Sequence, residues 1–298
     1  MEIRNRSKIC LIISAAIIVA ALILTAVGHG INLGIDFEGG LSMQYDLKTA
    51  VVKGDTEAVL EGMGVQSYTV TVQGSGDNEI NVRIKDVAQD DIQNIQAAFE
   101  DGIKGKYPDA ESIGDVNYVG PVAGATLVGN AIGAVLLATV LMLIYIAIRF
   151  DLSSGLAAVF GLVHDVLIML SFMVIFRSFI QMNSSFIAAA LTIVGYSINN
   201  TIVIFDRIRE NVKKLPSTPK EDVASISVKE SLGRTILTTL TTLITIVALC
   251  ILGVASIREF ALPIIVGILS GVYSANMINP YVWAFLEKKF SARKAKKA

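Results

Sequence analysis

The sequence predicts an α-helical membrane protein with six transmembrane helices and one polar α+β domain between the first two of them. Of its 298 residues, 53% are hydrophobic and only 17% are charged, whereas about a quarter of the residues in soluble domains are charged. The charges are also clustered, which leaves uncharged stretches of roughly twenty residues or more, enough for a helix to cross about 30 Å of hydrocarbon. These observations exclude a soluble globular protein.

Six stretches are apolar enough to be transmembrane helices. They are residues 9–27, 116–148, 152–176, 178–205, 235–257 and 260–286. The first follows three basic residues and could be a signal peptide, but it is longer than the usual apolar region of one, and no clear Ala-x-Ala site follows it. We therefore expect an uncleaved membrane anchor.

The distribution of basic residues predicts the orientation. One side has three before the first stretch, Arg149 after the second, seven from Arg207 to Arg234 and six near the C-terminus, while the opposite short loops have only Arg177 and Arg258. Basic residues beside a span resist translocation. We therefore expect a multi-pass protein of the cell membrane with both termini in the cytoplasm.

This topology gives three parts. Residues 1–30 form the cytoplasmic N-terminus and the first helix, residues 31–120 form an exported domain, and residues 121–298 form the other five helices with a cytoplasmic loop at 206–233 and a basic tail. Within the loop, residues 206–211 could continue the fourth helix, with a break at 213–219 and a second short helix from Lys220, or the loop could be a solvated linker. The exported part has 16 acidic and 6 basic residues, so the net charge of −1 conceals a segregation of charge between the two sides. Nothing here supports binding to nucleic acid.

Changes of hydrophobic period predict the elements of the exported domain. Strands are expected at 41–47, 68–72, 80–84 and 116–119, and helices at 56–63 and 90–103, with a turn at Gly74–Asp77. The order β-α-β-β-α-β predicts a ferredoxin-like domain, and another α+β module is the alternative. The exported domain has no His, Cys or phosphate-binding glycine loop, and we interpret Gly39–Gly40 as a turn.

A few polar groups interrupt the apolar stretches. They are His164 and Asp165 in the third, Asn199 and Asn200 in the fourth, and Arg234 with a stripe of threonines in the fifth. We interpret the threonines as packing residues. A carboxylate in hydrocarbon remains charged at a cost, finds a cation or takes up a proton, so Asp165 could be functional or could simply pair with His164.

Several strings resemble the SecF branch of the SecD/SecF family of protein-export membrane subunits. They are Gly34-Ile-Asp-Phe-Glu-Gly-Gly40, Arg149-Phe150, His164-Asp165-Val166, and Val194-Gly-Tyr-Ser-Ile-Asn199 leading to Phe205-Asp-Arg-Ile-Arg-Glu-Asn211. Their order and spacing cover essentially the whole chain. The combination is specific, although no single string would be.

The resemblance implies that the chain is a transport subunit, not an enzyme, and that it needs no cofactor. It implies a partnership with SecD, with the SecY channel complex, with the translocating polypeptide and with membrane lipids, in which the gradient of protons or sodium ions drives late translocation. SecD and SecF together resemble one transporter of the resistance-nodulation-division type. This chain would supply half of it.

One position departs from the family pattern. After Ser-Ile-Asn in the fourth span the family typically has Asp, grouped with an Arg at the start of the fifth span in the proposed ion path; here these positions are Asn200 and Arg234. An amide does not titrate near neutral pH. Coupling could therefore use another group such as Asp165 or one in SecD, or a metal cation held by the Asn carbonyl, or be lost.

Two other function classes are considered. The chain could be half of a resistance-nodulation-division exporter of small molecules, but an exported domain of about 90 residues is small for a drug pocket. An intramembrane hydrolase using His164 and Asp165 would need a nucleophile or a second metal ligand that no motif supplies.

Overall fold

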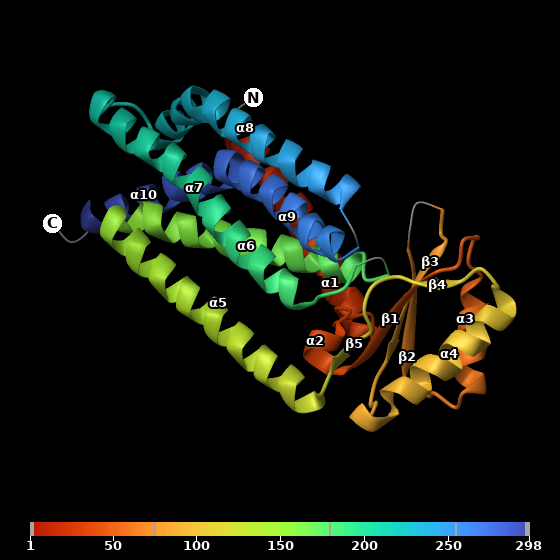
Figure 1. The fold of residues 1–298 in the computed structure, drawn as a ribbon. Coiled ribbons are helices and arrows are strands. Elements are labelled where there is room, and N and C mark those ends of the chain that lie inside the picture. Colours follow the sequence, from red (N-terminus) through yellow and green to blue (C-terminus); the bar gives the residue numbers. More distant parts are fainter. Residues whose placement is uncertain (1–2, 74–75, 179, 254, 296–298) are drawn as a thin grey trace. The chain divides into compact units, whose positions relative to one another are not determined.

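The structure, a computed structural model, describes residues 3–73, 76–178, 180–253 and 255–295 (Figure 1). The chain divides into two compact units, which we call the helical unit (residues 1–31, 134–175 and 185–298) and the α+β unit (residues 32–133 and 176–184). Gly74 and Ser75 of the predicted turn, and Lys296 and Lys297 of the basic tail, lie outside the described residues.

Six helical segments in the described part of the chain are long and apolar enough to cross a membrane, as the sequence predicts. They are Ser7–Ala26, Val122–Arg149, Leu152–Ile175, Ser184–Lys214, Lys220–Leu252 and Ile257–Ser291. The corresponding helices are α1 (Ile3–Ala26), α5 (Pro121–Arg149), α6 (Leu152–Ile175), α7 (Ser184–Lys214), α8 (Lys220–Leu252) and the sequence α9 (Ala255–Tyr273), η2 (Ser274–Ile278) and α10 (Asn279–Ala295). η2 is a π-helical turn, a feature often found at functional sites.

The predicted loop at 206–233 is largely helical: the continuation of the fourth helix and the helix start at Lys220 are both present, but the second helix is long and not a separate short one. α7 extends to Lys214 and α8 begins at Lys220, so that only residues 215–219 are non-helical. The charged residues after position 205 lie on the surface of the helix. Arg207 pairs with Glu210 of its own helix at 2.6 Å and with Glu230 of α8 at 2.7 Å. The predicted span ended at residue 205 because charged residues follow it. Hydrophobicity alone does not distinguish a helix that continues out of the membrane from a loop.

α6 is the best-packed single helix of the helical unit. It contacts α1, α9 and α10. Over half (56%) of its most apolar 18-residue segment is buried within the chain, compared with 6% for α5 and 11% for α8. On α9, a side chain at Gly267 would collide with Ile193 of α7, so the lack of one allows these helices to approach closely.

The α+β unit contains a five-stranded antiparallel sheet and two main helices. Its elements are α2 (Ile35–Glu38), β1 (Gly40–Asp46), α3 (Lys53–Gly62), β2 (Tyr68–Gln73), β3 (Glu79–Ile84), η1 (Gln89–Asp91), α4 (Ile92–Lys106), β4 (Glu111–Ser112) and β5 (Asn117–Val119). The strand order is β2-β3-β1-β4, and β5 also pairs with β1. The predicted final strand at 116–119 is present as β5, and the two-residue strand β4 was not predicted; Gly114, between the two, has a φ of +78°.

Both α3 and α4 lie on one face of this sheet (Figure 1). Alternate residues of β1, namely Leu41, Met43 and Tyr45, are buried there, and the ring of Tyr45 lies 5.4 Å from that of Phe99 on α4. Gly40 has a φ of +118°, and a Cβ at this position would collide with the carbonyl of Ile84. The Gly39–Gly40 pair is thus a backbone turn that sets the start of β1.

Candidate functional site: a buried carboxylate in the helical unit

Asp165, near the middle of α6, is completely buried and is surrounded by hydrogen-bond donors. Its Oδ1 accepts from Ser270 Oγ at 2.7 Å and lies 2.9 Å from Nδ1 of His164. Its Oδ2 accepts from Ser197 Oγ at 2.5 Å and from Ser274 Oγ at 2.8 Å. We call these five residues the Asp165 site.

The three serines belong to different elements. Ser197 is on α7, Ser270 is on α9, and Ser274 begins the π-helical turn η2. Ser270 and Ser274 are four residues apart and so share one face of the helix. Gly271 lies between them and faces α7, because a Cβ there would lie 3.4 Å from the Cα of Ser197.

His164 extends the network toward α1. Its Nε2 lies 2.7 Å from Ser14 Oγ and 2.9 Å from the hydroxyl of Tyr273, and these two hydroxyls are 2.6 Å apart. The rings of His164 and Tyr273 meet edge to face at 5.3 Å. With Nδ1 facing a carboxylate, the neutral imidazole carries its proton on Nδ1 and accepts at Nε2.

The sequence drew attention to His164 and Asp165 but missed the residues that complete the network. Ser197, Ser270, Ser274, Ser14 and Tyr273 are common residue types, and each is separated from Asp165 by at least 32 positions in the sequence. The only local signal was the spacing of Ser270 and Ser274 in an otherwise apolar stretch.

Asn200 is buried on α7, as expected for a residue facing the bundle interior. It is 1% exposed, and its Nδ2 has no hydrogen-bond partner among the described residues. Arg234, in contrast, is exposed on α8. Within this chain the two positions that the resemblance groups in the ion path therefore do not share a buried face, because the buried stripe of α8 passes through Ser231, Thr235 and Thr239 instead.

Two further amides, Asn276 and Asn279, lie on the last span, and one of them bonds to Thr201, the neighbour of Asn200 in the sequence. Asn279 of α10 donates from Nδ2 to Thr201 Oγ1 at 2.9 Å, while its Oδ1 has no partner among the described residues. Thr235 reaches Oδ1 of Asn276 at 3.4 Å. These groups are polar but do not titrate near neutral pH, so they can solvate an ion but not carry a proton.

Most hydroxyl groups of the threonine stripe on α8 donate hydrogen bonds within their own helix. Thr238, Thr242 and Thr245 donate to carbonyls of the preceding turn of their own helix. Among the members of the predicted stripe, Thr235 is the one for which the structure gives a hydrogen bond to another element. The stripe therefore contributes little to the network around Asp165.

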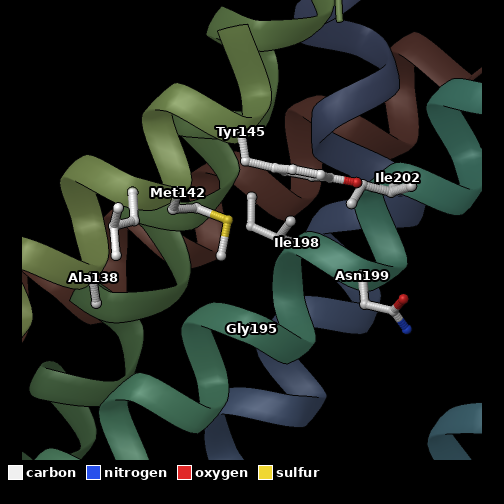
Figure 2. A pocket seen from close by; sticks show the side chains of 8 residues that line it. Ala138, Met142, Tyr145, Gly195, Ile198, Asn199 and Ile202 are labelled. Atoms are coloured by element: carbon white, nitrogen blue, oxygen red, sulfur yellow. The ribbon is translucent and has the colours of Figure 1, made fainter. Parts of the chain in front are cut away.

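A shallow groove of about 400 Å³ separates α5 from α7 (Figure 2). Apolar side chains such as Met142 and Ile198 form its walls, and the amide of Asn199 turns away from α5. In the described part of the chain no three His, Cys, Asp or Glu residues are grouped as metal ligands would be. The groove therefore has the chemistry of a packing surface more than that of an ion site.

In the α+β unit, the polar contacts are structural. A carboxylate oxygen of Asp36 accepts from the backbone N–H of Ser184 at 2.8 Å at the start of α7. Hydrogen bonds from the backbone and side chain of Lys48 lower the pKa of Asp46, and those from Lys106 and Tyr107 lower the pKa of Asp55. The side chains of Asp46 and Asp55 are partly exposed, at 21% and 40%.

Comparison with known proteins agrees with this architecture. The model of the C-terminal region of the protein-export membrane proteins SecD/SecF matches residues 99–289, and the model of the SecD/SecF GG motif matches residues 27–51. The chain belongs to the SecD/SecF family. Because the GG-motif match contains Gly39–Gly40, the turn that begins β1 is part of the family signature.

Curated members of the SecD/SecF family match most of the chain. The protein translocase subunit SecF of Rickettsia typhi is 32% identical over 94% of this chain and 91% of its own length. The protein translocase subunit SecDF of Bacillus subtilis is 34% identical over 95% of this chain, which spans only 37% of that longer protein. These relatives are named as translocase subunits, so the family has a transport role rather than a catalytic one.

Solved structures of the family have the same fold. The crystal structure of SecDF, a translocon-associated membrane protein from Thermus thermophilus, superposes with a TM-score of 0.81 at 31% identity, covering 95% of this chain and 38% of that one. A second SecDF structure, in a super-membrane-facing form, gives a TM-score of 0.66 over 99% of this chain. The family therefore includes longer chains of which this one corresponds to a part.

Proposed function

We propose that this chain is a SecF-like subunit of the Sec protein-export machinery that works with a SecD-like partner and uses an ion gradient to promote late translocation of polypeptides. The observation that carries the proposal is the match to SecF of Rickettsia typhi along 94% of this chain and 91% of the relative. A match at both ends of a chain supports a shared role more strongly than a shared fold does.

The partnership with SecD is supported by the size of the SecDF relatives. This chain spans 38% of the Thermus thermophilus SecDF chain, so a second component would supply the remainder. The helices also leave apolar surface for it: Leu136, Leu137 and Leu141 on α5 are each about 60% exposed within this chain. Membrane lipids and the SecY channel complex would be further partners.

The proposed location is the cell membrane, with both termini in the cytoplasm and the α+β unit exported. The charge asymmetry of the loops supports this orientation. The exported module would be ferredoxin-like, and the antiparallel order β2-β3-β1-β4 supports that assignment because a split βαβ arrangement places the first and third strands side by side.

Asn200, Arg234 and Asp165 are the proposed ion-path residues. Asn200 and Asp165 are both buried on the helices α7 and α6. Arg234 is exposed in the isolated chain, so it would act in the path only if a partner helix covers it. The small-molecule exporter is less well supported, since the named relatives are translocase subunits.

The experiment is reconstitution. An affinity-tagged chain is purified from detergent-solubilised membranes, and a co-purifying SecD-like chain is sought. Vesicles containing the SecY channel and the SecD-like chain, with and without this chain, are then given a labelled precursor while a proton gradient is imposed and afterwards collapsed. We expect gradient-dependent stimulation only when this chain is present; equal translocation without it would refute the proposed function.

A further inference from the structure

We propose that the Asp165 site is where the helical unit binds and releases a proton, with His164 passing that proton between the hydroxyls on its Nε2 side and the carboxyl group of Asp165. The inference rests on the proposed function only in linking this proton to export. The protonation itself is a property of the chain that can be measured alone.

The first argument is the composition of the site. An ionised carboxylate has about four lone-pair positions, and here four donors occupy them, at distances of 2.5–2.9 Å. Three of these donors are serine hydroxyls, which are neutral and can rotate. His164 is the only ion-pair partner found for Asp165 in the part of the chain that the structure describes. A fixed Arg or Lys would hold the carboxylate permanently charged, whereas rotating hydroxyls can accommodate both of its protonation states.

The second argument is the path through His164. A proton that arrives at Nε2 from the side of Ser14 and Tyr273 gives an imidazolium; the proton on Nδ1 then passes to Oδ1 of Asp165, 2.9 Å away. The imidazole is neutral again, now with its proton on Nε2, and the carboxylate has become a carboxylic acid. Atoms and charge balance, and no other reactant is needed.

The surrounding titratable groups are few. α6 contributes His164, α9 contributes Tyr273, and α1 contributes Cys10, whose charge would act on Tyr273. α7 and η2 present Ser197 and Ser274 to the carboxylate. On α10, which also packs against α6, Glu287 bonds to Ser153, twelve positions or about 18 Å along α6 from Asp165.

Protonation of Asp165 would also change hydrogen bonds to several helices at once. When Asp165 is neutral, the new O–H on its Oδ1 donates to Nδ1 of His164, and the serine hydroxyls donate to a neutral carboxyl group, which is a weaker acceptor than a carboxylate. Because the serines are on α7, α9 and η2, this change weakens contacts between α6 and each of them. The π-helical turn that begins at Ser274 is a place where the last span can adjust.

Asn200 cannot bind and release a proton near neutral pH, whereas Asp165 can. Among the residues that the structure describes, Asp165 is the only buried carboxylate. A chain of this family in which the fourth span has an amide at the titrating position still has, one helix away, a buried carboxyl with a hydrogen-bonded route to it.

Infrared difference spectroscopy on the purified full chain tests the site. Spectra are recorded at acid and alkaline pH in potassium buffer, and the carbonyl-stretch band of a buried protonated carboxyl is sought by comparing variants. We expect Asp165→Asn to remove one such band and Asp206→Asn, at a half-exposed carboxylate paired with Arg149, to leave it. An identical buried-acid band in the Asp165→Asn protein would overturn the proposal.

A second pair of variants keeps the test decisive if Asp165→Asn does not fold. Ser270→Ala removes one hydrogen bond from Oδ1 and should shift the frequency of the band, whereas Ser171→Ala, whose hydroxyl bonds to the carbonyl of Leu167 on the same helix, should not. His164→Gln should slow the exchange of the band in heavy water by removing the relay. No shift with Ser270→Ala, or a band that responds to added sodium instead of to pH, would overturn the proposal.

The link to export is a separate measurement. In the reconstituted vesicles, Asp165→Asn should reduce translocation under a proton gradient to its level without a gradient, and Ser171→Ala should retain full stimulation. If the unsubstituted chain gives no stimulation, the proposed function fails while the infrared result stands. If Asp165→Asn retains stimulation in spite of losing the band, the site binds a proton that export does not use, and the link is refuted.

Discussion

Buried polar side chains in this chain differ in how fully their neighbours satisfy them. Asp165 has a donor for each lone pair, whereas the hydroxyl of Tyr45 and the Nδ2 of Asn200 have no partner among the described residues. A satisfied buried carboxylate is held in one geometry by several helices, while an unsatisfied group costs about 1–3 kcal/mol. The two kinds of residue should therefore respond oppositely to substitution.

Tyr45 gives a prediction for the α+β unit. Burial, and to a smaller extent the charge of Glu100, raises the pKa of Tyr45 from 10.0 to about 12. The folded state then holds the phenol proton more tightly than the unfolded state, so this contribution to stability is present below pH 10 and is lost as the pH rises toward 12. Tyr45→Phe should raise the free energy of unfolding by about 1 kcal/mol at neutral pH and flatten the alkaline loss. Chemical denaturation at neutral and alkaline pH measures both; a loss of more than about 1 kcal/mol at neutral pH would show that the hydroxyl is satisfied.

Asn200 gives a prediction for the helical unit. Asn200→Asp has nearly the same shape and supplies a group that can take up a proton at a buried position of α7. We expect it to increase gradient-dependent translocation in the reconstituted vesicles, with Asn199→Asp, at an exposed position of the same helix, as the matched control. If Asn200→Asp adds nothing and the unsubstituted chain already shows full gradient dependence, position 200 is not in the ion path of this chain, and Asp165 remains the candidate.

At the scale of elements, the parts that follow a local period could be predicted from the sequence. The alternation of Leu41, Met43 and Tyr45 and the helical spacing of Phe99 and Ile103 each match a buried face. A continuation of the fourth helix into 206–211 and a helix start at Lys220 could also be predicted, whereas the single long helix α8 could not, because charged residues end an apolar stretch without ending a helix.

The candidate site was predictable only in part, for a similar reason. His164 and Asp165 stand out because charge is rare in a span, but Ser197, Ser270 and Ser274 become significant only when the fold brings three elements to one carboxylate. The exposure of Arg234 could not be predicted, because packing decides which face of a helix is buried, and on α8 the buried position is Thr235, one residue further along.

The α+β unit should fold by itself. Its core is formed by its own strands and helices, with Leu41, Leu60, Val82 and Phe99 among the fully buried residues, and a domain of about 90 residues can bury a sufficient core. A fragment of residues 32–120, which retains β5, should unfold cooperatively in denaturant, followed by circular dichroism. Leu60→Ala should lower its free energy of unfolding by about 2–5 kcal/mol, while Gly62→Ala, where a Cβ meets open space, should not. Non-cooperative unfolding of the fragment would show that the unit depends on the rest of the chain.

At the scale of the molecule, the helices divide into those that pack within the chain and those that do not. In the most apolar 18-residue segment of each span, 56% of α6 and 61% of the last span is buried within the chain, whereas only 6–11% is buried in α1, α5 and α8. In water such exposed apolar faces would be an aggregation hazard, but in a bilayer they are ordinary surface for lipid or for a partner helix. The structure of the isolated chain is therefore consistent with a subunit of a larger membrane assembly.

The orientation of this assembly gives the last prediction. Basic residues flank the spans on the side of the turn 215–219 and are scarce beside the opposite loops, so the exposed Asp109 of the α+β unit should lie outside the cell and the exposed Ser217 inside. Asp109→Cys should react with a membrane-impermeant thiol reagent added to intact cells, and Ser217→Cys should react only after permeabilisation. The unsubstituted chain is the control, because Cys10 and Cys250 lie within candidate spans and should stay unlabelled in intact cells. Equal labelling of both variants in intact cells, or labelling of Ser217→Cys alone, would contradict the topology, and it would also place the α+β unit on the side where it could not receive an exported polypeptide.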